Sequence, residues 1–87
     1  MNKIEFMRWF EERKDALAMW TVSIDEENMS DYVIGCFFEN KSETWKVYIN
    51  KGRGKHSVRL ETNDEKQAFN KLSVLVEYVI ESNRGYI

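Results

Sequence analysis

The alternation of apolar and polar residues between positions 45 and 60 predicts two β-strands joined by a tight turn. Its period of two, and its content of aromatic and β-branched residues, are typical of strands. Gly52 and Gly54, on either side of Arg53, supply the positive φ angles that a tight or bulged hairpin requires. The alternating apolar positions are expected in the core: Trp45, Val47, Val58 and Leu60.

A helix is expected at each end of the chain. Residues 3–19 place apolar side chains at spacings of three and four, with charged residues on the opposite side. Residues 62–65 (Thr-Asn-Asp-Glu) have the form of a capping box and predict a second helix that ends near Gly85. Between the first helix and the hairpin, residues 20–24 predict a short strand. Residues 32–38 predict a strand that is apolar on both faces.

These elements predict an α+β fold with the order α-β-β-β-β-α, in which an N-terminal and a C-terminal helix pack on a four-stranded antiparallel sheet. The antiparallel arrangement is expected because a parallel crossover requires roughly a dozen or more residues, and the links here are short. The 87 residues suffice for one core, so residues 1–87 are expected to form a single domain. Gly35, inside the apolar strand, predicts a bulge or a close approach by another group.

The bulk composition indicates a soluble protein. Charged residues make up 32% of the chain, and the net charge of −2 is unlike that of a strongly basic DNA-binding protein. Cys36 is the single cysteine, so no disulfide can form within the chain, which is typical of a reducing compartment. No apolar run approaches the roughly eighteen residues of a membrane span, and the charged start does not fit a signal peptide. We expect a cytoplasmic protein without a membrane partner.

No pattern in the sequence predicts a catalytic, metal or cofactor site. His56 has no nucleophile or orienting carboxylate at a suggestive spacing, so a structural role at the strand end is favoured. Cys36 is interpreted as a buried structural thiol, because it lies in the most apolar strand. The acids of residues 25–31 resemble a calcium loop only superficially, since Ser30 and Cys36 occupy the positions of its glycine and final acid. We therefore expect no enzyme activity, no metal and no cofactor.

Charge is divided unevenly along the chain. Residues 44–60 contain five basic residues and no acid, whereas residues 25–31 contain four acids and no base. The basic hairpin could track a phosphate backbone with Tyr48 as a stacking surface. The favoured interpretation is a solvated strand face whose cations discourage edge-to-edge pairing, because the remaining chain is acidic. The acidic loop, in turn, is either a hydrated loop or a surface that attracts a basic partner.

Three short motifs follow one another in the second half of the chain. They are Trp45-Lys-Val-Tyr48, the Arg53-Gly54 turn, and a helix start at residues 63–68 in which acids precede an alanine. Over residues 45–72 they resemble the small immunity proteins of bacterial polymorphic toxin systems of the contact-dependent inhibition type. Those proteins have a Trp-x-Val-Tyr strand, an Arg-Gly turn and a similar helix start. Here the Arg-Gly pair lies one residue further from the tryptophan, with Gly52 as the apparent insertion.

The resemblance implies an inhibitor that is not an enzyme and that neutralises a cognate toxin domain, often a nuclease, in a stoichiometric complex. An acidic loop would suit such a partner by mimicking substrate phosphates. The expected partner contacts are the acids that would steer a basic toxin, together with tyrosines and arginines, which are enriched at binding hot spots. They are Glu26, Glu27, Asp31, Tyr32, Tyr48, Arg53 and Arg59.

Two other functions are compatible with the sequence. The first is a small nucleic-acid-binding or regulatory domain that uses the basic hairpin, residues 46–59, and nucleic acid is an expected partner only in that case. The second is a structural module that dimerises through the apolar strand, residues 32–38. The chain is accordingly expected as a monomer or a weak homodimer.

Overall fold

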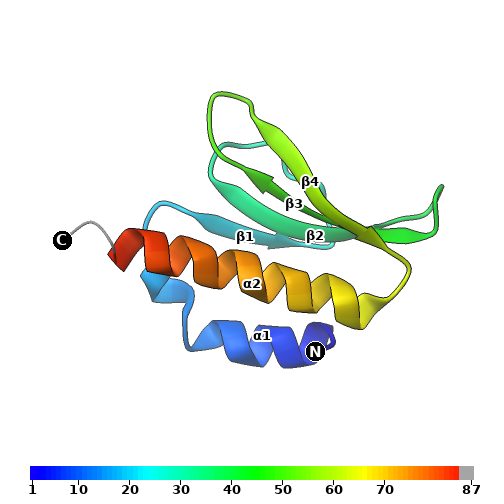
Figure 1. Ribbon diagram of the computed structural model, residues 1–87, viewed down its shortest axis with the longest axis horizontal. Helices are drawn as coiled ribbons and strands as arrows, with labels where there is room; N and C mark the ends of the chain where they lie inside the picture. Colours follow the sequence, from blue (N-terminus) through cyan, green and yellow to red (C-terminus); the bar gives the residue numbers. More distant parts are fainter. Residues whose placement is uncertain (85–87) are drawn as a thin grey trace.

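The computed structural model describes residues 1–84, which form an α+β fold with the predicted order α-β-β-β-β-α (Figure 1). Figure 1 shows α2 along one face of the sheet, with α1 beside it. The predicted helix stop at Gly85 lies outside the described residues. Within residues 1–84, no helix is long and apolar enough to cross a membrane. The elements are α1 (Lys3–Glu11), the 3-10 helix η1 (Lys14–Leu17), β1 (Thr21–Ile24), β2 (Val33–Glu39), β3 (Thr44–Asn50), β4 (His56–Thr62) and α2 (Glu65–Arg84).

The predicted helix over residues 3–19 is divided into α1 and η1. α1 begins with a capping box, in which the Asn2 side chain accepts a hydrogen bond from the Glu5 amide and the Glu5 carboxylate accepts one from the Asn2 amide. It ends because the Arg13 guanidinium donates to the Trp9 carbonyl at 2.7 Å, and the Arg13 amide donates to Phe10 instead. Two of the last carbonyl groups of α1 are thus satisfied without a further helical turn.

The second helix, α2, begins at a side-chain cap and buries the whole of its predicted apolar stripe. Asp64 caps it, because its carboxylate accepts a hydrogen bond from the Lys66 amide at 2.9 Å. Thr62 supports this cap by accepting from the Asp64 amide. All members of the apolar stripe are buried: Ala68, Phe69, Leu72, Leu75, Val76, Val79 and Ile80.

The sheet has the order β1-β2-β3-β4 and is mixed, so the prediction of a purely antiparallel sheet is wrong at one edge. β2 pairs antiparallel to β3, and β3 to β4, but β1 runs parallel to β2. A parallel link can be short here because β1 has only four residues, a length of roughly 13 Å. Residues 25–32 can span up to roughly 26 Å when extended, which is enough to return the chain to the start of β2.

The core lies between the sheet and the helices. β2 and β3 direct Ile34, Cys36, Val47 and Ile49 into it, and each is at most 1% exposed. Phe69 of α2 packs on it from the helix side. Cys36 is therefore buried, as predicted. Because β2 lies between β1 and β3, neither of its edges is free to pair with a strand of a second copy.

A β-bulge in the hairpin reverses the alternation that the sequence predicts for β4. Val47 pairs with Leu60, whereas Tyr48 pairs with Val58, so Arg59 is the additional residue. One additional residue moves the side chains that precede it in β4 to the other face of the sheet, relative to Leu60 after it. Val58 consequently lies on the outer face and is 47% exposed, which contradicts its predicted place in the core.

Candidate protein-binding surface

The acidic loop, residues 25–32, joins β1 to β2 and lies over the outer face of the sheet, opposite the helices. Its two ends have non-glycine residues in the left-handed region, Asp25 at φ 70° and Tyr32 at φ 58°. An aspartate tolerates that conformation, whereas an aromatic residue seldom adopts it. Backbone hydrogen bonds from Thr21 to Tyr32 and from Asp25 to Cys36 tie both ends to the sheet.

Tyr48, on the outer face of β3, holds the middle of this loop against the sheet. Its hydroxyl donates to the Glu26 carbonyl at 2.9 Å and accepts from the Asn28 amide at 2.8 Å. The ring is completely buried and lies against Gly35, where a Cβ atom would be 2.2 Å from the ring. The close approach predicted at Gly35 is thus confirmed. Burial is also the main reason that the pKa of Tyr48 is raised above its ordinary value.

Asn50, the last residue of β3, holds the next part of the loop. It is 2% exposed, and its side-chain amide donates to the Asn28 carbonyl at 2.7 Å and to the Ser30 carbonyl at 2.8 Å. The Ser30 amide then donates to the Asn28 side chain at 2.9 Å. Since Tyr48 and Asn50 are both anchored in β3, they fix the loop backbone to the sheet.

His56 completes the polar layer under the loop. Its ring centroid lies 5.1 Å from that of Tyr48, and its Nδ1 lies 2.6 Å from the Asn50 side-chain oxygen. Its Nε2 is buried, makes no hydrogen bond within residues 1–84 and lies 3.4 Å from the Glu27 carboxylate. Glu27 is a neighbour that sequence spacing did not indicate, because the loop and the hairpin meet only in the folded chain.

The exposed side of the loop combines acids with two apolar side chains. Met29 is 59% exposed and Tyr32 is 40% exposed. Tyr32 packs at its base on Trp20, with ring centroids 5.4 Å apart, and against Gly52 of the hairpin turn. The exposed acids of the loop are Asp25, Glu26, Glu27 and Asp31.

Several of these acids also have partners within the chain. Asp25 pairs with Lys3, and Glu26 accepts a hydrogen bond from the Ser23 hydroxyl at 3.1 Å. Asp31 accepts one from the Gly54 amide at 3.3 Å. These contacts hold the carboxylates in defined positions while leaving them open to solvent.

The structure brings together five of the seven predicted contact residues. Glu26, Glu27, Asp31 and Tyr32 lie on the acidic loop, and the turn that carries Arg53 is bonded to the loop through Gly54. Gly52 and Gly54 have φ angles of 101° and 72°, which confirms the turn prediction, and Arg53 between them is also left-handed at 55°.

The other two predicted contacts lie elsewhere. Tyr48 is beneath the loop, so it is neither a partner contact nor a stacking surface. Its place on the polar side of the alternation indicated exposure, but Gly35 on the neighbouring strand leaves room for the ring to be covered. Arg59 lines a groove beside α2 and does not belong to the loop surface.

The ionisable groups do not form a metal centre in the part of the chain that the structure describes. Within residues 1–84, no three His, Cys, Asp or Glu side chains are placed to hold a metal ion. Burial raises the pKa of the Cys36 thiol to about 12, so this group is protonated at neutral pH.

Comparisons with known proteins give no family assignment. No family model, no curated protein and no solved structure matches the chain. The likeness to immunity proteins therefore rests on the short motifs within residues 45–72.

Proposed function

We propose that this chain is an immunity protein that neutralises a toxin domain by forming a stoichiometric complex, and that the acidic loop is its main contact surface. The observation that carries the proposal is the support of the loop by Tyr48 and Asn50. These buried side chains make four hydrogen bonds to the loop backbone. A loop that is already ordered before binding loses less conformational entropy when it meets a partner, and this favours affinity.

The composition of the loop surface suits a basic protein partner. Met29 and Tyr32 provide apolar contact area, and Glu26, Glu27 and Asp31 of the same loop provide exposed carboxylates. Apolar residues within a polar rim are the usual arrangement of a binding interface. Complementary charge would accelerate association with a basic toxin, such as a nuclease.

The backbone of the loop also supports a functional role. Tyr32 has an unfavourable left-handed conformation, although a glycine would adopt it at lower cost. Strained residues of this kind cluster at binding and active sites, where the surrounding structure holds them. Here the conformation places the tyrosine between Trp20 and Gly52, at the edge of the acidic surface.

The alternative of nucleic-acid binding by residues 46–59 has less support. Its stacking residue, Tyr48, is buried, and Lys46 pairs with Glu39 at 2.8 Å. The hairpin turn also adjoins the acidic loop, whose carboxylates would repel a phosphate backbone.

The test is capture of a partner from a lysate of the organism that encodes the chain. Three tagged proteins are compared: the unchanged chain, a loop variant (Glu26→Gln, Glu27→Gln, Asp31→Asn) and a control variant (Glu11→Gln, Glu77→Gln, Glu81→Gln). Each variant removes three exposed acids, and amides keep the shape of the side chains. Circular dichroism and thermal unfolding establish that all three are folded.

The unchanged chain and the control are expected to retain one protein at a one-to-one ratio, and the complex should persist in about 0.5 M salt because salt does not screen its apolar contacts. The loop variant is expected to retain much less in about 0.1 M salt, where exposed charges at contact distance still interact. Added back, the purified chain should abolish the toxicity or enzymatic activity of the captured protein. Recovery of nucleic acid that is lost as salt rises, or equal capture by the loop variant, would contradict the proposal.

A further inference from the structure

A groove lies between the hairpin and α2, on the side of the sheet away from the acidic loop. We propose that this β4–α2 groove binds an extended acidic peptide segment of a partner protein, with one apolar side chain of the peptide inserted between the strands and the helix. The inference is independent of the immunity function and of the loop surface. The groove is lined by Ile49, Lys51, Arg59, Leu75 and Tyr78.

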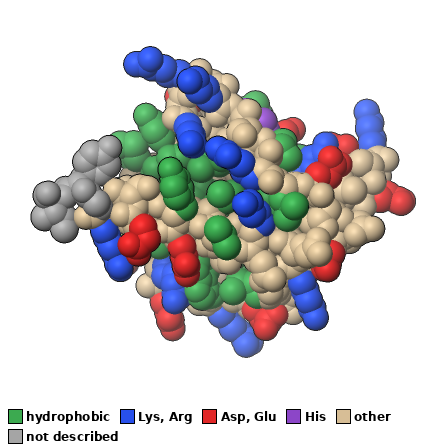
Figure 2. Space-filling view, in the orientation of Figure 1, with side chains coloured by type: hydrophobic (Ala, Val, Ile, Leu, Met, Phe, Trp, Pro, Cys, Tyr) green, Lys and Arg blue, Asp and Glu red, His purple; other side chains and the backbone are tan. Residues whose placement is uncertain are grey.

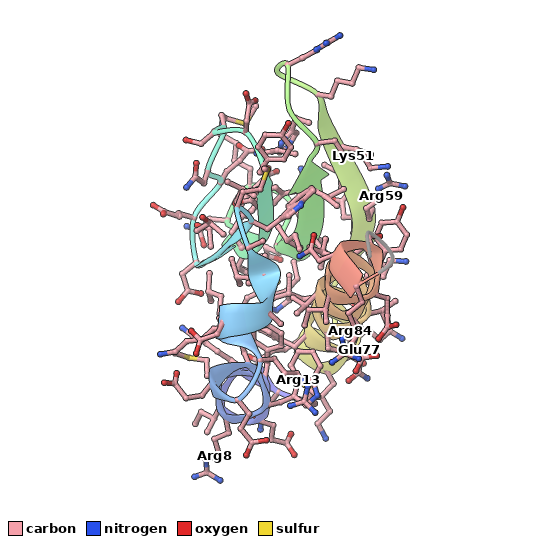
Figure 3. The ribbon with its side chains drawn as sticks, turned by 90° about the vertical axis from the view of Figure 1, so that its left-hand side faces the viewer. Arg8, Arg13, Lys51, Arg59, Glu77 and Arg84 are labelled. Atoms are coloured by element: carbon pink, nitrogen blue, oxygen red, sulfur yellow. The ribbon has the colours of Figure 1, made fainter. Side chains whose placement is uncertain are left out.

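The bulge in β4 contributes one of the side chains that line this groove. Arg59 is the additional residue of the bulge, and it lines the groove together with Leu75 and Tyr78 of α2. Figure 3 shows Lys51 and Arg59 close together, on the side of the hairpin that faces α2. Two basic side chains therefore stand at the mouth of the groove.

The interior of the groove is apolar. Ile49 and Leu75 are 1% and 9% exposed and form its floor, whereas Tyr78 is 57% exposed at its side. Val74, one turn before Tyr78, is exposed as well and extends the apolar surface of the helix. The volume of about 250 Å³ is below the roughly 300–1,000 Å³ of small-molecule sites, so a single apolar side chain is the appropriate occupant.

The charge at the groove indicates the chemistry of the partner. Figure 2 shows Lys and Arg side chains next to hydrophobic side chains on this face of the molecule. Within residues 1–84 the lysine and arginine ion pairs use Lys3, Arg13, Lys14, Lys46 and Arg84, but not Lys51, Arg53, Lys55 or Arg59. Lys51 and Arg59 are thus available to carboxylates on both sides of an inserted side chain, and such charge-assisted hydrogen bonds are strong.

A peptide fits the groove better than a nucleic acid does. The floor consists of aliphatic side chains, which offer no hydrogen bonds to the edge of a base. Tyr78 is the one aromatic side chain among the lining residues, whereas strand-binding proteins present successive stacking surfaces along a basic track. A carboxylate, by contrast, can receive two parallel hydrogen bonds from Arg59.

The test is a fluorescence anisotropy titration with the full chain. The probe is a labelled peptide, Asp-Glu-Asp-Leu-Asp-Glu-Asp, and the control peptide has serine in place of the leucine. The protein variants are Tyr78→Ala, which removes the apolar side, and Arg59→Gln, which removes the charge. Lys66→Gln removes an exposed cation from the start of α2, away from the groove, and serves as the matched control.

Saturable binding of the leucine peptide is expected, weakened about tenfold by Tyr78→Ala and by Arg59→Gln, because hot-spot residues have effects of this size. The serine peptide should bind about tenfold more weakly, and Lys66→Gln should bind as the unchanged chain does. Absence of saturation at about 1 mM peptide, or equal binding of the two peptides, would overturn the inference.

Three further outcomes identify a different occupant and would also overturn it. The first is tighter binding of a labelled oligothymidine than of the peptide, with the same dependence on Arg59. The second is self-association of the unchanged chain in sedimentation experiments that Arg59→Gln abolishes, which would indicate the acidic loop of a second copy. The third is peptide binding only after the chain is ended at Arg84, which would indicate its own last residues.

Discussion

The two faces of the sheet are covered by different kinds of contact. On the inner face, Val47 and Ile49 pack against α2 in a core of apolar side chains. On the outer face, Tyr48 and Asn50 of the same strand are equally buried, but they hold the acidic loop through hydrogen bonds to its backbone. One strand therefore supplies both the core of the domain and the support of its candidate binding surface.

This difference gives the two faces different roles: the inner face stabilises the fold, and the outer face fixes the position of the acidic loop. Apolar burial is non-directional and scales with the area removed from water, so the inner face provides most of the folding energy. Hydrogen bonds require defined distances and angles, so the outer face fixes the position of the loop. Substitutions on the inner face should unfold the whole domain, whereas those on the outer face should first release residues 25–32.

The largest effect is expected from Leu72→Ala on the inner face. Leu72 is completely buried in the middle of α2, and truncation of such a residue costs about 2–5 kcal/mol. Urea denaturation should show this loss in the free energy of unfolding, and protection of the loop and of the helices should fall together. A variant in which the loop alone becomes accessible to protease would contradict the assignment of Leu72 to the common core.

Gly35→Ala is expected to have the next largest effect, and it acts on the outer face. The new Cβ atom would lie 2.2 Å from the Tyr48 ring, and overpacking of this kind costs about 1–3 kcal/mol. The cost should fall when Tyr48→Leu removes the ring, and this double-mutant cycle is measured by urea denaturation. Gly54→Ala is the control, since it meets no neighbouring atom and carries only the cost of its φ of 72°.

Val58 provides a sharper test of the bulge, with a small expected effect. Because Val58 lies on the outer face and is 47% exposed, Val58→Thr should change the free energy of unfolding by no more than about 0.5 kcal/mol. The same change at Val47, which is completely buried, should cost about 1–3 kcal/mol because it buries a hydroxyl. Equal losses of unfolding free energy at Val58 and Val47 would contradict the bulge and support the uninterrupted alternation that the sequence predicts.

The smallest effect concerns the ion pair between Glu39 and Lys46 on the outer face. The hydrogen bond from Lys46 lowers the pKa of Glu39 below 4.5, and the hydrogen bond to Glu39 raises the pKa of Lys46 above 10.5. The stability that the pair contributes is therefore present between these values. It is lost as pH falls through the lowered carboxyl pKa, or rises through the raised ammonium pKa.

The measurement compares the thermal midpoints of the unchanged chain and of a Glu39→Gln, Lys46→Met variant. Their difference should be constant between about pH 5 and pH 10, and should shrink outside that range and at high salt. A difference that grows as the solution becomes acidic would contradict the sign of the Glu39 shift.

The parts of the fold that depend on residues close together in the chain could be predicted from the sequence. The apolar stripe of α2 and the turn at Gly52 and Gly54 are local patterns, and the structure confirms both. The parallel pairing of β1 and the bulge at Arg59 depend on contacts between distant segments. No glycine marks the bulge, and the alternation through Val58 and Leu60 reads as uninterrupted.

The candidate site could likewise be predicted only where it depends on local sequence. The acidic loop is evident from its composition, but its support by Tyr48 and Asn50 depends on the register between β2 and β3. That register places Gly35 opposite Tyr48 and so makes room for the ring. Gly35 was the available signal, because a glycine inside an apolar strand indicates a close neighbour, although the sequence does not identify which residue approaches.

The central claim, that buried side chains of β3 hold the acidic loop in place, is tested most directly by hydrogen exchange in Tyr48→Phe. This variant keeps the ring but removes the hydroxyl that bonds the Asn28 amide and the Glu26 carbonyl. Tyr78→Phe is the matched control, since it removes an exposed tyrosine hydroxyl from α2. In Tyr48→Phe the Asn28 amide should exchange about tenfold faster while amides of α2 keep their protection, and Tyr78→Phe should leave the loop unchanged. Equally fast exchange of the Asn28 amide in the unchanged chain and in Tyr48→Phe would contradict the claim.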